Sequence, residues 1–393
     1  MKPNVKIGSF LLAVMMLLST LLVAGCTPIS LNKEWSYKTA DEELAIGVYI
    51  YSLDVAYNQA MTYAQKLEDY DASKSDWLDK EITDDDGDKM IAKDWIKAEA
   101  KTMCLSYLVV DAQLKEMGID VGEATLDSAK AQAETYWNVG QYADMGYVMP
   151  MSKDLEPFGI SFDSFAYCST LYSVKYSAIF DATYNVGGTK EVTDADLTKF
   201  FTEKYTDYSY VSVNLYSSTT DEAGSSKNVA LSEAEAKKLT SEFDAYAKDL
   251  NSGKSYDDVI KAYMDANNLT SDPSTSNIEQ LENTSAGEDI KKAVEGLGNN
   301  KATTIKVGEA DSAIYYLVYK RDINETAKTY LTEKANHDNV LGAMKSEEFA
   351  DYIEGLTKDF ECEENTSVIE KYDPKMFFVP VEPTTAAATE SED

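Results

Sequence analysis

Apolar residues recur every three or four positions along much of the first half of this chain, a spacing typical of amphipathic helices. Gly118 ends one of these repeats in the manner of a left-handed C-terminal cap, and Gly187 with Gly188 ends the last of them. We therefore predict a helical block over residues 41–189. Its repeats cover residues 41–55, 91–112, 123–138 and 162–179.

The pattern changes after Lys190. Thr193, three residues before Asp196, is a good helix N-cap. Residues 208–216 then alternate apolar and polar, which predicts a half-buried strand. These features predict a small α/β unit over 190–323. Its other expected parts are a polar loop at 219–227, helices at 231–250, 256–267 and 289–295, and strands at 303–307 and 313–320.

The alternation in the first strand assigns its side chains to two faces. Val211, Val213 and Leu215 point to one side. The opposite side carries Tyr210, Ser212, Asn214 and Tyr216.

Residues 324–379 return to a helical period, with Phe349 and Ile353 on one face. The segment 380–393 is rich in Thr, Ala and acidic residues, has little to bury, and is predicted to be disordered. The expected fold is therefore α+β and mainly α. A helical domain, formed by 41–189 and the returning helix 324–379, is interrupted by the α/β unit 190–323.

The first 25 residues have the layout of an export signal: basic Lys2 and Lys6, an apolar run, and small residues before Cys26. The run is shorter than the roughly 20 apolar residues that a membrane-spanning helix needs. Val23-Ala24-Gly25-Cys26 resembles the lipobox of bacterial lipoproteins, which implies cleavage before Cys26 and lipid attachment to it. We expect an extracytoplasmic protein, anchored by that lipid to the bacterial cell membrane through a tether over 26–40.

Charge excludes one class of function. The 393 residues carry a formal charge of −33, and removal of Lys2 and Lys6 would make it −35. A basic surface is needed to neutralise phosphates, so no nucleic-acid partner is expected. An acidic body instead attracts cationic segments of unfolded polypeptides, although acidity also serves solubility alone.

Residue usage argues against metal and cofactor chemistry. His337 is the only histidine, which excludes most zinc sites and Ser-His-Asp catalysis. The acidic run before and after Gly87 resembles a calcium loop only superficially, because Ile82 would have to be the first ligand. We predict an acidic turn there, no metal and no cofactor. Beyond Cys26 three cysteines remain, and a Cys104–Cys168 bridge stays open as a possibility.

Several short motifs, in order, resemble the PrsA/SurA class of extracytoplasmic foldases. In that class a helical chaperone domain carries a parvulin-type prolyl isomerase domain. Their order and spacing cover most of the chain. The motifs are Leu114–Val121, Val192–Leu197 with Phe200-Phe201, Leu250–Tyr256, Ser271-Asp272-Pro273, Ala293–Leu297, Tyr315–Val318 and Asp322-Ile323.

The resemblance implies two histidines on adjacent central strands, and this chain has neither. Alignment on Asp322-Ile323 puts Tyr316 at one position. The other falls at Val213 or Asn214, and the alternation favours Asn214. Tyr316 and Asn214 either hydrogen-bond across the strands or are ordinary sheet residues. The glycine-rich segment usual in the family is replaced by residues 277–281.

These observations predict a chaperone or foldase that binds unfolded or exported polypeptides, with weak or absent isomerase activity. One alternative is an active prolyl isomerase with substituted site residues. A second is a solute-binding lipoprotein, against which the long helical block argues, and a third is a surface protein without clients. The sequence does not set the oligomeric state.

Overall fold

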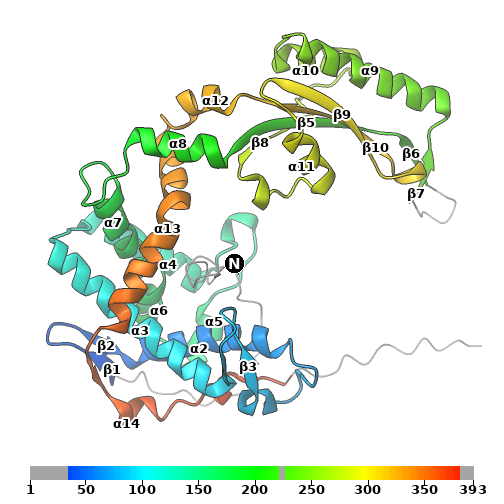
Figure 1. Ribbon diagram of the computed structural model, residues 1–393. Helices are drawn as coiled ribbons and strands as arrows, with labels where there is room; N and C mark the ends of the chain where they lie inside the picture. The colour runs from blue at the N-terminus through cyan, green and yellow to red at the C-terminus, as the bar shows by residue number, and fades with distance from the viewer. Residues whose placement is uncertain (1–33, 221–225, 381–393) are drawn as a thin grey trace, which may run out of the picture. The chain divides into compact units, whose positions relative to one another are not determined.

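The computed structural model describes residues 34–220 and 226–380 (Figure 1). The fold is mixed α+β and mainly helical, with 57% helix and 15% strand, as predicted. The chain divides into two compact units. Of the described residues, unit 1 comprises 34–191 and 345–380, and unit 2 comprises 192–220 and 226–344. The expected signal peptide, Cys26 and most of the expected acidic tail lie outside the described residues.

The prediction of a tether over 26–40 is wrong for its last part. Trp35–Lys38 forms strand β1, which pairs antiparallel with β2 (Glu43–Ala45) and with β11 (Glu363–Glu364). Tyr37 is only 1% exposed. A strand of four residues is too short to show a period, so no apolar pattern predicted it. Residues 26–33 lie outside the described part of the chain.

Helix α2 (Ile46–Ala64) begins five residues later than the expected start at Asp41. It is also buried on nearly every side: consecutive residues from Ile46 to Asp54 are all buried. A helix that is apolar all round occupies the middle of a core rather than its surface. The prediction of an amphipathic helix is therefore wrong here, because α2 is packed against on all sides, chiefly by α3 (Ala92–Met117).

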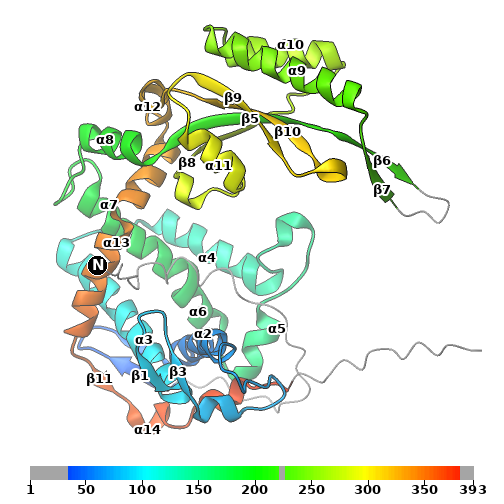
Figure 2. The ribbon, with the colours of Figure 1, turned by 45° about the vertical axis from the view of Figure 1, so that its right-hand side comes forward.

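Helix α6 (Phe162–Ala166), from later in the chain, also packs against α2 (Figure 2). The predicted helix over 123–138 is confirmed as α4 (Glu123–Asn138), and Gly118 caps α3 with φ 66° as expected. The segment between α4 and residue 162 contains short helical turns. The remaining elements are η3 (Asp76–Asp79), β3 (Glu81–Thr83), β4 (Lys89–Ile91), η4 (Ala143–Met145), α5 (Ser152–Leu155), η5 (Glu156–Phe158), η6 (Tyr167–Leu171), α7 (Tyr172–Tyr184), α14 (Thr366–Ile369) and η9 (Pro374–Phe377).

Aromatic rings fill much of the core of unit 1. The ring of Tyr57 lies 5.2 Å from that of Trp77 and 5.7 Å from that of Phe377. The ring of Phe349, in the C-terminal half of α13 (Lys334–Lys358), lies 4.7 Å from Tyr176. The returning helix thus completes this core, as expected. Many of the tyrosines are therefore structural.

Cys104 and Cys168 are buried and free, and they form no disulfide. Cys362 is also free. In the described residues no helix is both long and apolar enough to cross a bilayer.

Unit 2 is built on an antiparallel four-stranded sheet in the order β8-β5-β10-β9. The predicted helices and strands are confirmed, with small shifts at their ends. The strands are β5 (Thr206–Asn214), β8 (Thr275–Glu279), β9 (Lys301–Val307) and β10 (Ile314–Lys320), and the helices are α8 (Asp194–Lys204), α9 (Glu233–Asn251), α10 (Tyr256–Asn267), α11 (Glu288–Glu295) and α12 (Ile323–Tyr330). Short turns η7 (Leu281–Asn283) and η8 (Ala310–Ser312) join them.

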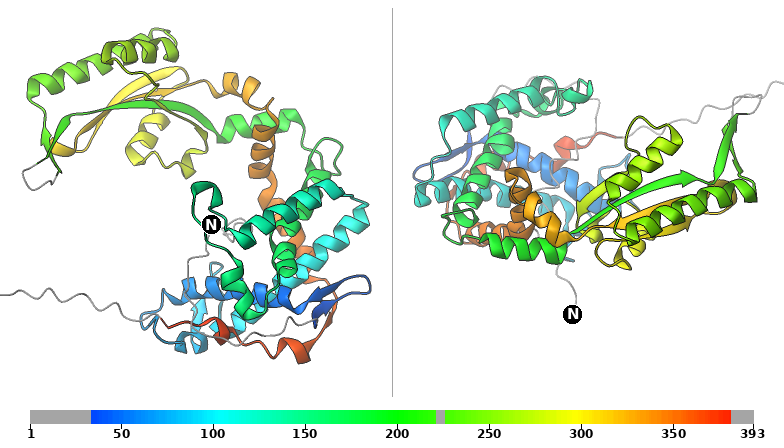
Figure 3. Two further views of the ribbon diagram at one scale, coloured as in Figure 1. Left: turned by 180° about the vertical axis from the view of Figure 1, so that it is seen from behind. Right: turned by 90° about the horizontal axis from the view of Figure 1, so that it is seen from above.

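Two strand regions in unit 2 escaped prediction. The expected polar loop at 219–227 overlaps a hairpin of β6 (Tyr216–Thr220) and β7 (Ser226–Ala230), which extends from the end of β5 (Figure 3). Strand β8 occupies the place of the missing glycine-rich segment. Both are polar and short, so no apolar period marks them. The unit also ends later than the expected residue 323, because α12 and the start of α13 group with it.

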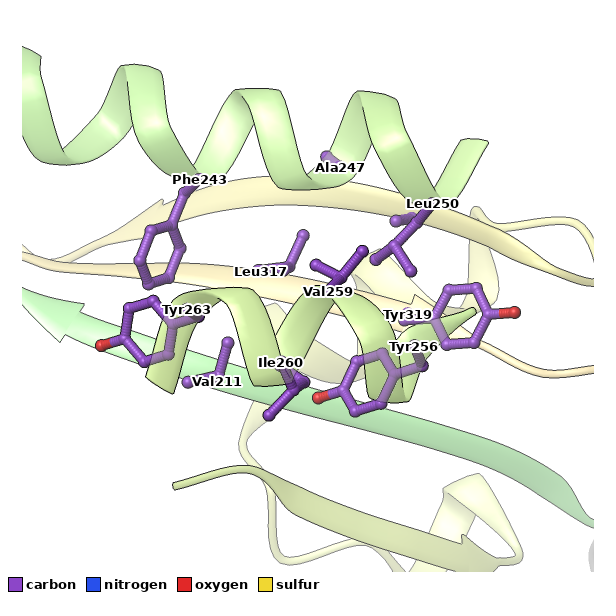
Figure 4. Packing of buried hydrophobic residues seen from close by; sticks show 11 residues of the cluster. Val211, Phe243, Ala247, Leu250, Tyr256, Val259, Ile260, Tyr263, Leu317 and Tyr319 are labelled. Atoms are coloured by element: carbon purple, nitrogen blue, oxygen red, sulfur yellow. The ribbon is translucent and has the colours of Figure 1, made fainter. Parts of the chain in front are cut away.

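Each face of the sheet has its own cluster of buried residues. Helices α9 and α10 cover one face, where Phe243, Leu250 and Ile260 pack onto Val211 and Leu317 (Figure 4). Helix α11 covers part of the other face, where its Ile290 and Val294 pack with Tyr208 and Val318. The alternation predicted for β5 is confirmed, since Val211 and Tyr210 belong to opposite clusters.

One buried ion pair ties the ends of the central strands to α12. Arg321, the only arginine in the sequence, donates to Oδ1 of Asp207 at 3.0 Å and to Oγ of Ser209 at 2.7 Å. Asp207 is 5% exposed, and its second carboxylate oxygen accepts a 2.7 Å hydrogen bond from Thr326. The guanidinium also lies over the ring of Tyr256, 4.9 Å from its centre. Both hydrogen bonds come from Nη1, and it is the stacking of the flat guanidinium on Tyr256 that suits arginine and not lysine.

Arg321→Lys should lower the free energy of unfolding of unit 2 by about 1–3 kcal/mol, because lysine keeps the charge but loses the stacking on Tyr256 and must place a shorter, differently shaped donor between Asp207 and Ser209. Circular dichroism during urea unfolding reports both units, whereas tryptophan fluorescence reports unit 1, which holds all four tryptophans. The exposed pair Lys328–Glu325 gives the control. An equal loss in Lys328→Gln would contradict the special role of Arg321, since exposed pairs contribute little.

Unit 1 contains a carboxyl group whose burial makes its stability depend on pH. Asp54 is 9% exposed, and burial raises the pKa of its carboxyl to about 7, with Asn58 donating a hydrogen bond that opposes the shift. The native state therefore keeps this proton where the unfolded chain has lost it. The group lowers stability progressively as pH rises from about 4 to about 7.

Asp54→Asn should remove this penalty. Near pH 4 the variant and the parent should differ little, whereas at pH 8 the variant should be more stable by about 2–4 kcal/mol. Urea unfolding followed by tryptophan fluorescence at both pH values measures the difference. Asp127→Asn, at an exposed site on α4, is the control. A gain at pH 8 no larger than that of the control would refute the buried, protonated carboxyl.

Candidate functional site

The two strands that the sequence analysis singled out, β5 and β10, are the central strands of the unit 2 sheet. Their register places Tyr316 opposite Ser212, and Asn214 opposite Ile314. Asn214 and Tyr316 therefore share one face but stand diagonally, two residues apart in register. The hydrogen bond across the strands that we considered would have to run along this diagonal, because Ser212 and not Asn214 stands directly opposite Tyr316.

The side chain of Tyr316 instead meets another tyrosine. Its ring packs edge-on against Tyr210 of β5, with 6.0 Å between ring centres. Tyr210 in turn stacks on Tyr208 at 6.4 Å. The three rings form a row across the central strands, which we call the tyrosine row (Tyr208, Tyr210 and Tyr316).

The inner end of the tyrosine row is fixed. Tyr208 is fully buried, and its hydroxyl donates to Glu279 at 2.5 Å and lies 2.8 Å from Oγ1 of Thr284. Burial, followed by the contact with Glu279, raises the pKa of Tyr208 to about 12. A phenol in this setting stays neutral at physiological pH and acts as an anchor.

The outer end of the row is open. Tyr210 and Tyr316 are partly exposed, and Ser212 and Asn214 beside them are exposed. Helix α11 covers the sheet at Tyr208 and Val318, and Tyr210 and Tyr316 pack against the edge of this cluster while part of each ring stays exposed. The result is an aromatic surface with a hydroxyl and an amide at its edge, on a rigid sheet.

The chemistry available at this surface is binding rather than proton transfer. Burial, followed by the neighbouring Tyr210 and Tyr216, raises the pKa of Tyr316, so its phenol holds its proton at neutral pH. No imidazole stands on either central strand. Tyrosine rings offer large, rigid contact area at low conformational cost and tolerate water at their tips.

The other residues considered from sequence lie elsewhere. His337 is on α13, where its Nδ1 lies 3.3 Å from Asp338. The acidic run forms the turn of the β3–β4 hairpin, in which Asp84 accepts hydrogen bonds from the backbone of Asp86 and Asp88. Within residues 34–220 and 226–380 no group of three or more His, Cys, Asp or Glu is arranged to hold a metal ion. Cys26 lies outside the described part.

Two features of unit 2 were not predicted from the sequence. The contact between Tyr210 and Tyr316 depends on strand register, which a single sequence does not fix. Arg321 was also missed, although its being the only arginine was a signal that could have found it.

No protein-family model matches this chain, and no curated protein matches it in sequence. The interpretation of the site therefore depends on its geometry and on the motif resemblance.

A matched pair of substitutions distinguishes the anchored Tyr208 from the partly exposed Tyr316. Tyr208→Phe leaves Glu279 without its donor and Thr284 without its hydroxyl partner, and should cost about 1–2 kcal/mol of unfolding free energy. Tyr316→Phe should cost less than about 0.5 kcal/mol, because Tyr316 is partly exposed. Urea unfolding followed by circular dichroism measures both. Equal costs would show that the outer end of the row is as fixed as the inner end.

Proposed function

We propose that this protein is an extracytoplasmic chaperone or foldase, anchored to the membrane through a lipid on Cys26, that binds unfolded exported polypeptides. In this proposal unit 1 is the helical chaperone domain and unit 2 is the parvulin-like insert. The single observation that carries the proposal is the tyrosine row, whose outer end is partly exposed on the central strands. In the family that the chain resembles, substrate contacts are expected on these two central strands.

The physical basis of binding is burial of apolar side chains against aromatic faces. Proline rings and aliphatic side chains pack well on such faces, as aromatic-lined grooves for proline-rich segments illustrate. Tyr210 and Tyr316 are held in place by the anchored Tyr208, so little conformational entropy is lost on binding. The contact is broad and tolerant of sequence, which suits many clients.

Strong isomerase activity is not part of the proposal. Rotation about a peptide bond has a barrier of about 18–20 kcal/mol for an ordinary amide, and an isomerase must stabilise the twisted form. The histidines that the family resemblance expects are replaced by Asn214 and Tyr316. The phenol of Tyr316 stays neutral, so it can only donate or accept a hydrogen bond.

An active isomerase with substituted residues is the second candidate. One observation favours it: Ser212 and Asn214 place a hydroxyl and an amide on the same face as Tyr316. These groups can hydrogen-bond a peptide carbonyl. A solute-binding protein gains no such support, because neither unit consists of matched strand–helix lobes.

The protein should suppress aggregation of an unfolded reporter and bind proline-containing peptides. Tyr210→Ser/Tyr316→Ser should weaken peptide binding by about tenfold, whereas Tyr210→Phe/Tyr316→Phe should retain it, since the rings and not the hydroxyls carry the contact. Fluorescence anisotropy with a labelled peptide measures the affinity. Equal affinity of the serine variant and the parent would remove the tyrosine row from the proposal.

A proline-peptide isomerisation assay decides between the two candidates. We expect little or no turnover. Strong turnover that is abolished by Tyr316→Phe or Asn214→Ala would establish the enzyme instead. Turnover unaffected by either substitution would place catalysis away from this face.

A further inference from the structure

Exposed large apolar side chains are concentrated in one loop of unit 1. In the described residues nine such side chains are exposed, and five of them lie between α4 and α5. We call residues 141–150 the Met–Tyr loop. Its exposed members are Tyr142 (40%), Met145 (71%), Tyr147 (61%), Val148 (70%) and Met149 (38%).

The Met–Tyr loop has a fixed base. The backbone N–H of Met149 donates to Val139 at 2.7 Å, and that of Met151 donates to Tyr136 at 3.2 Å. Gly140 has φ 111°, and a Cβ there would lie 2.3 Å from the carbonyl oxygen of Met149, so only glycine allows this closure. The loop projects past the end of α4 before the chain turns back to α5 (Figure 2).

Buried neighbours hold the base in place. Trp137, at the end of α4, is 6% exposed and packs against Phe165 with 5.5 Å between ring centres. Met151, just after the loop, is 8% exposed. The apolar side chains at the tip are therefore held in solvent by a packed base.

We propose that the Met–Tyr loop is a second binding site, separate from the tyrosine row, for apolar polypeptide segments flanked by lysine or arginine. Methionine is flexible and polarisable and adapts to varied apolar partners, and tyrosine adds rigid area. An exposed apolar group of this kind marks an interaction site. That the ligand is a polypeptide rests on the proposed function. The residues of the Met–Tyr loop are, however, different from those of the tyrosine row.

The charge of the loop region favours a polypeptide with cationic flanks over a second copy of this chain or an anionic membrane surface. Residues 131–156 contain four carboxylates, Glu134, Asp144, Asp154 and Glu156, against Lys153 alone. With a net charge of −33 on the whole chain, a second copy and an anionic membrane surface are both repelled. Cationic residues beside an apolar client segment are attracted.

The test compares two triple variants of the full chain. Met145→Ser/Tyr147→Ser/Val148→Ser removes the exposed tip of the loop. Val186→Ser/Val229→Ser/Leu269→Ser removes three exposed apolar residues elsewhere and is the matched control. The probes are a fluorescent peptide with an apolar centre and lysine flanks, and its twin with glutamate flanks.

The loop variant should bind the lysine-flanked peptide at least about tenfold more weakly than the parent, with an unchanged unfolding midpoint, and the control variant should stay within about twofold. The parent should bind the glutamate-flanked twin several-fold more weakly. Unchanged affinity in the loop variant, or an equal loss in the control, overturns the proposal. Equal binding of the two peptides overturns its charge selectivity.

Two further measurements test whether the Met–Tyr loop instead binds a membrane or a second copy of this chain. Loop-dependent binding to phosphatidylcholine vesicles, or loop-dependent dimerisation in sedimentation, without peptide binding would overturn the proposal in favour of a membrane or a second copy. A parent that suppresses no aggregation and binds no peptide defeats the proposed function itself. If the parent suppresses aggregation and binds peptide, and the loop variant does so equally well, the proposed function stands and only the binding site at the Met–Tyr loop is refuted.

Discussion

The pairing of β5 with β10 is the constraint on which unit 2 depends. These strands are about a hundred residues apart in the sequence and run antiparallel over seven residue pairs, from Ile314–Asn214 to Lys320–Tyr208. The pairing places Val211 beside Leu317 for the core under α9 and α10, and Tyr210 beside Val318 on the opposite face. One register thus sets both cores and the tyrosine row. A slip by one residue would exchange the two faces.

The bridge between Arg321 and Asp207 protects that register. It lies where β10 ends and β5 begins, and the backbone N–H of Arg321 also donates to the carbonyl oxygen of Asp207 at 2.9 Å. Removing either partner would leave a desolvated charge, which is more costly than losing an exposed pair. The bridge therefore penalises any shift between the central strands. The position of Tyr316 relative to Tyr210 follows from this restraint.

Long periodic segments were predictable, and short polar ones were not. The bounds of α4 and α10 follow from the apolar period with clear stops at each end. Strand β8 has the sequence Thr-Ser-Asn-Ile-Glu and shows no such period, yet it pairs fully with β5. The faces of β5 were also predictable from alternation, so Asn214 was placed on the correct face. Its diagonal relation to Tyr316 was not, because register depends on partners far away in the sequence.

The two proposed surfaces differ in the forces that they use. The tyrosine row is a rigid sheet surface, whose contribution is mainly burial of apolar area, and this contribution is maintained or strengthened by salts that are excluded from protein surfaces. The Met–Tyr loop adds attraction between carboxylates and cationic flanks, which salt screens beyond about 8 Å at physiological ionic strength. Client binding should therefore respond to salt in two opposite ways. So large a negative charge opposes self-association through these apolar surfaces, because like charges repel across the contact that the surfaces would otherwise favour.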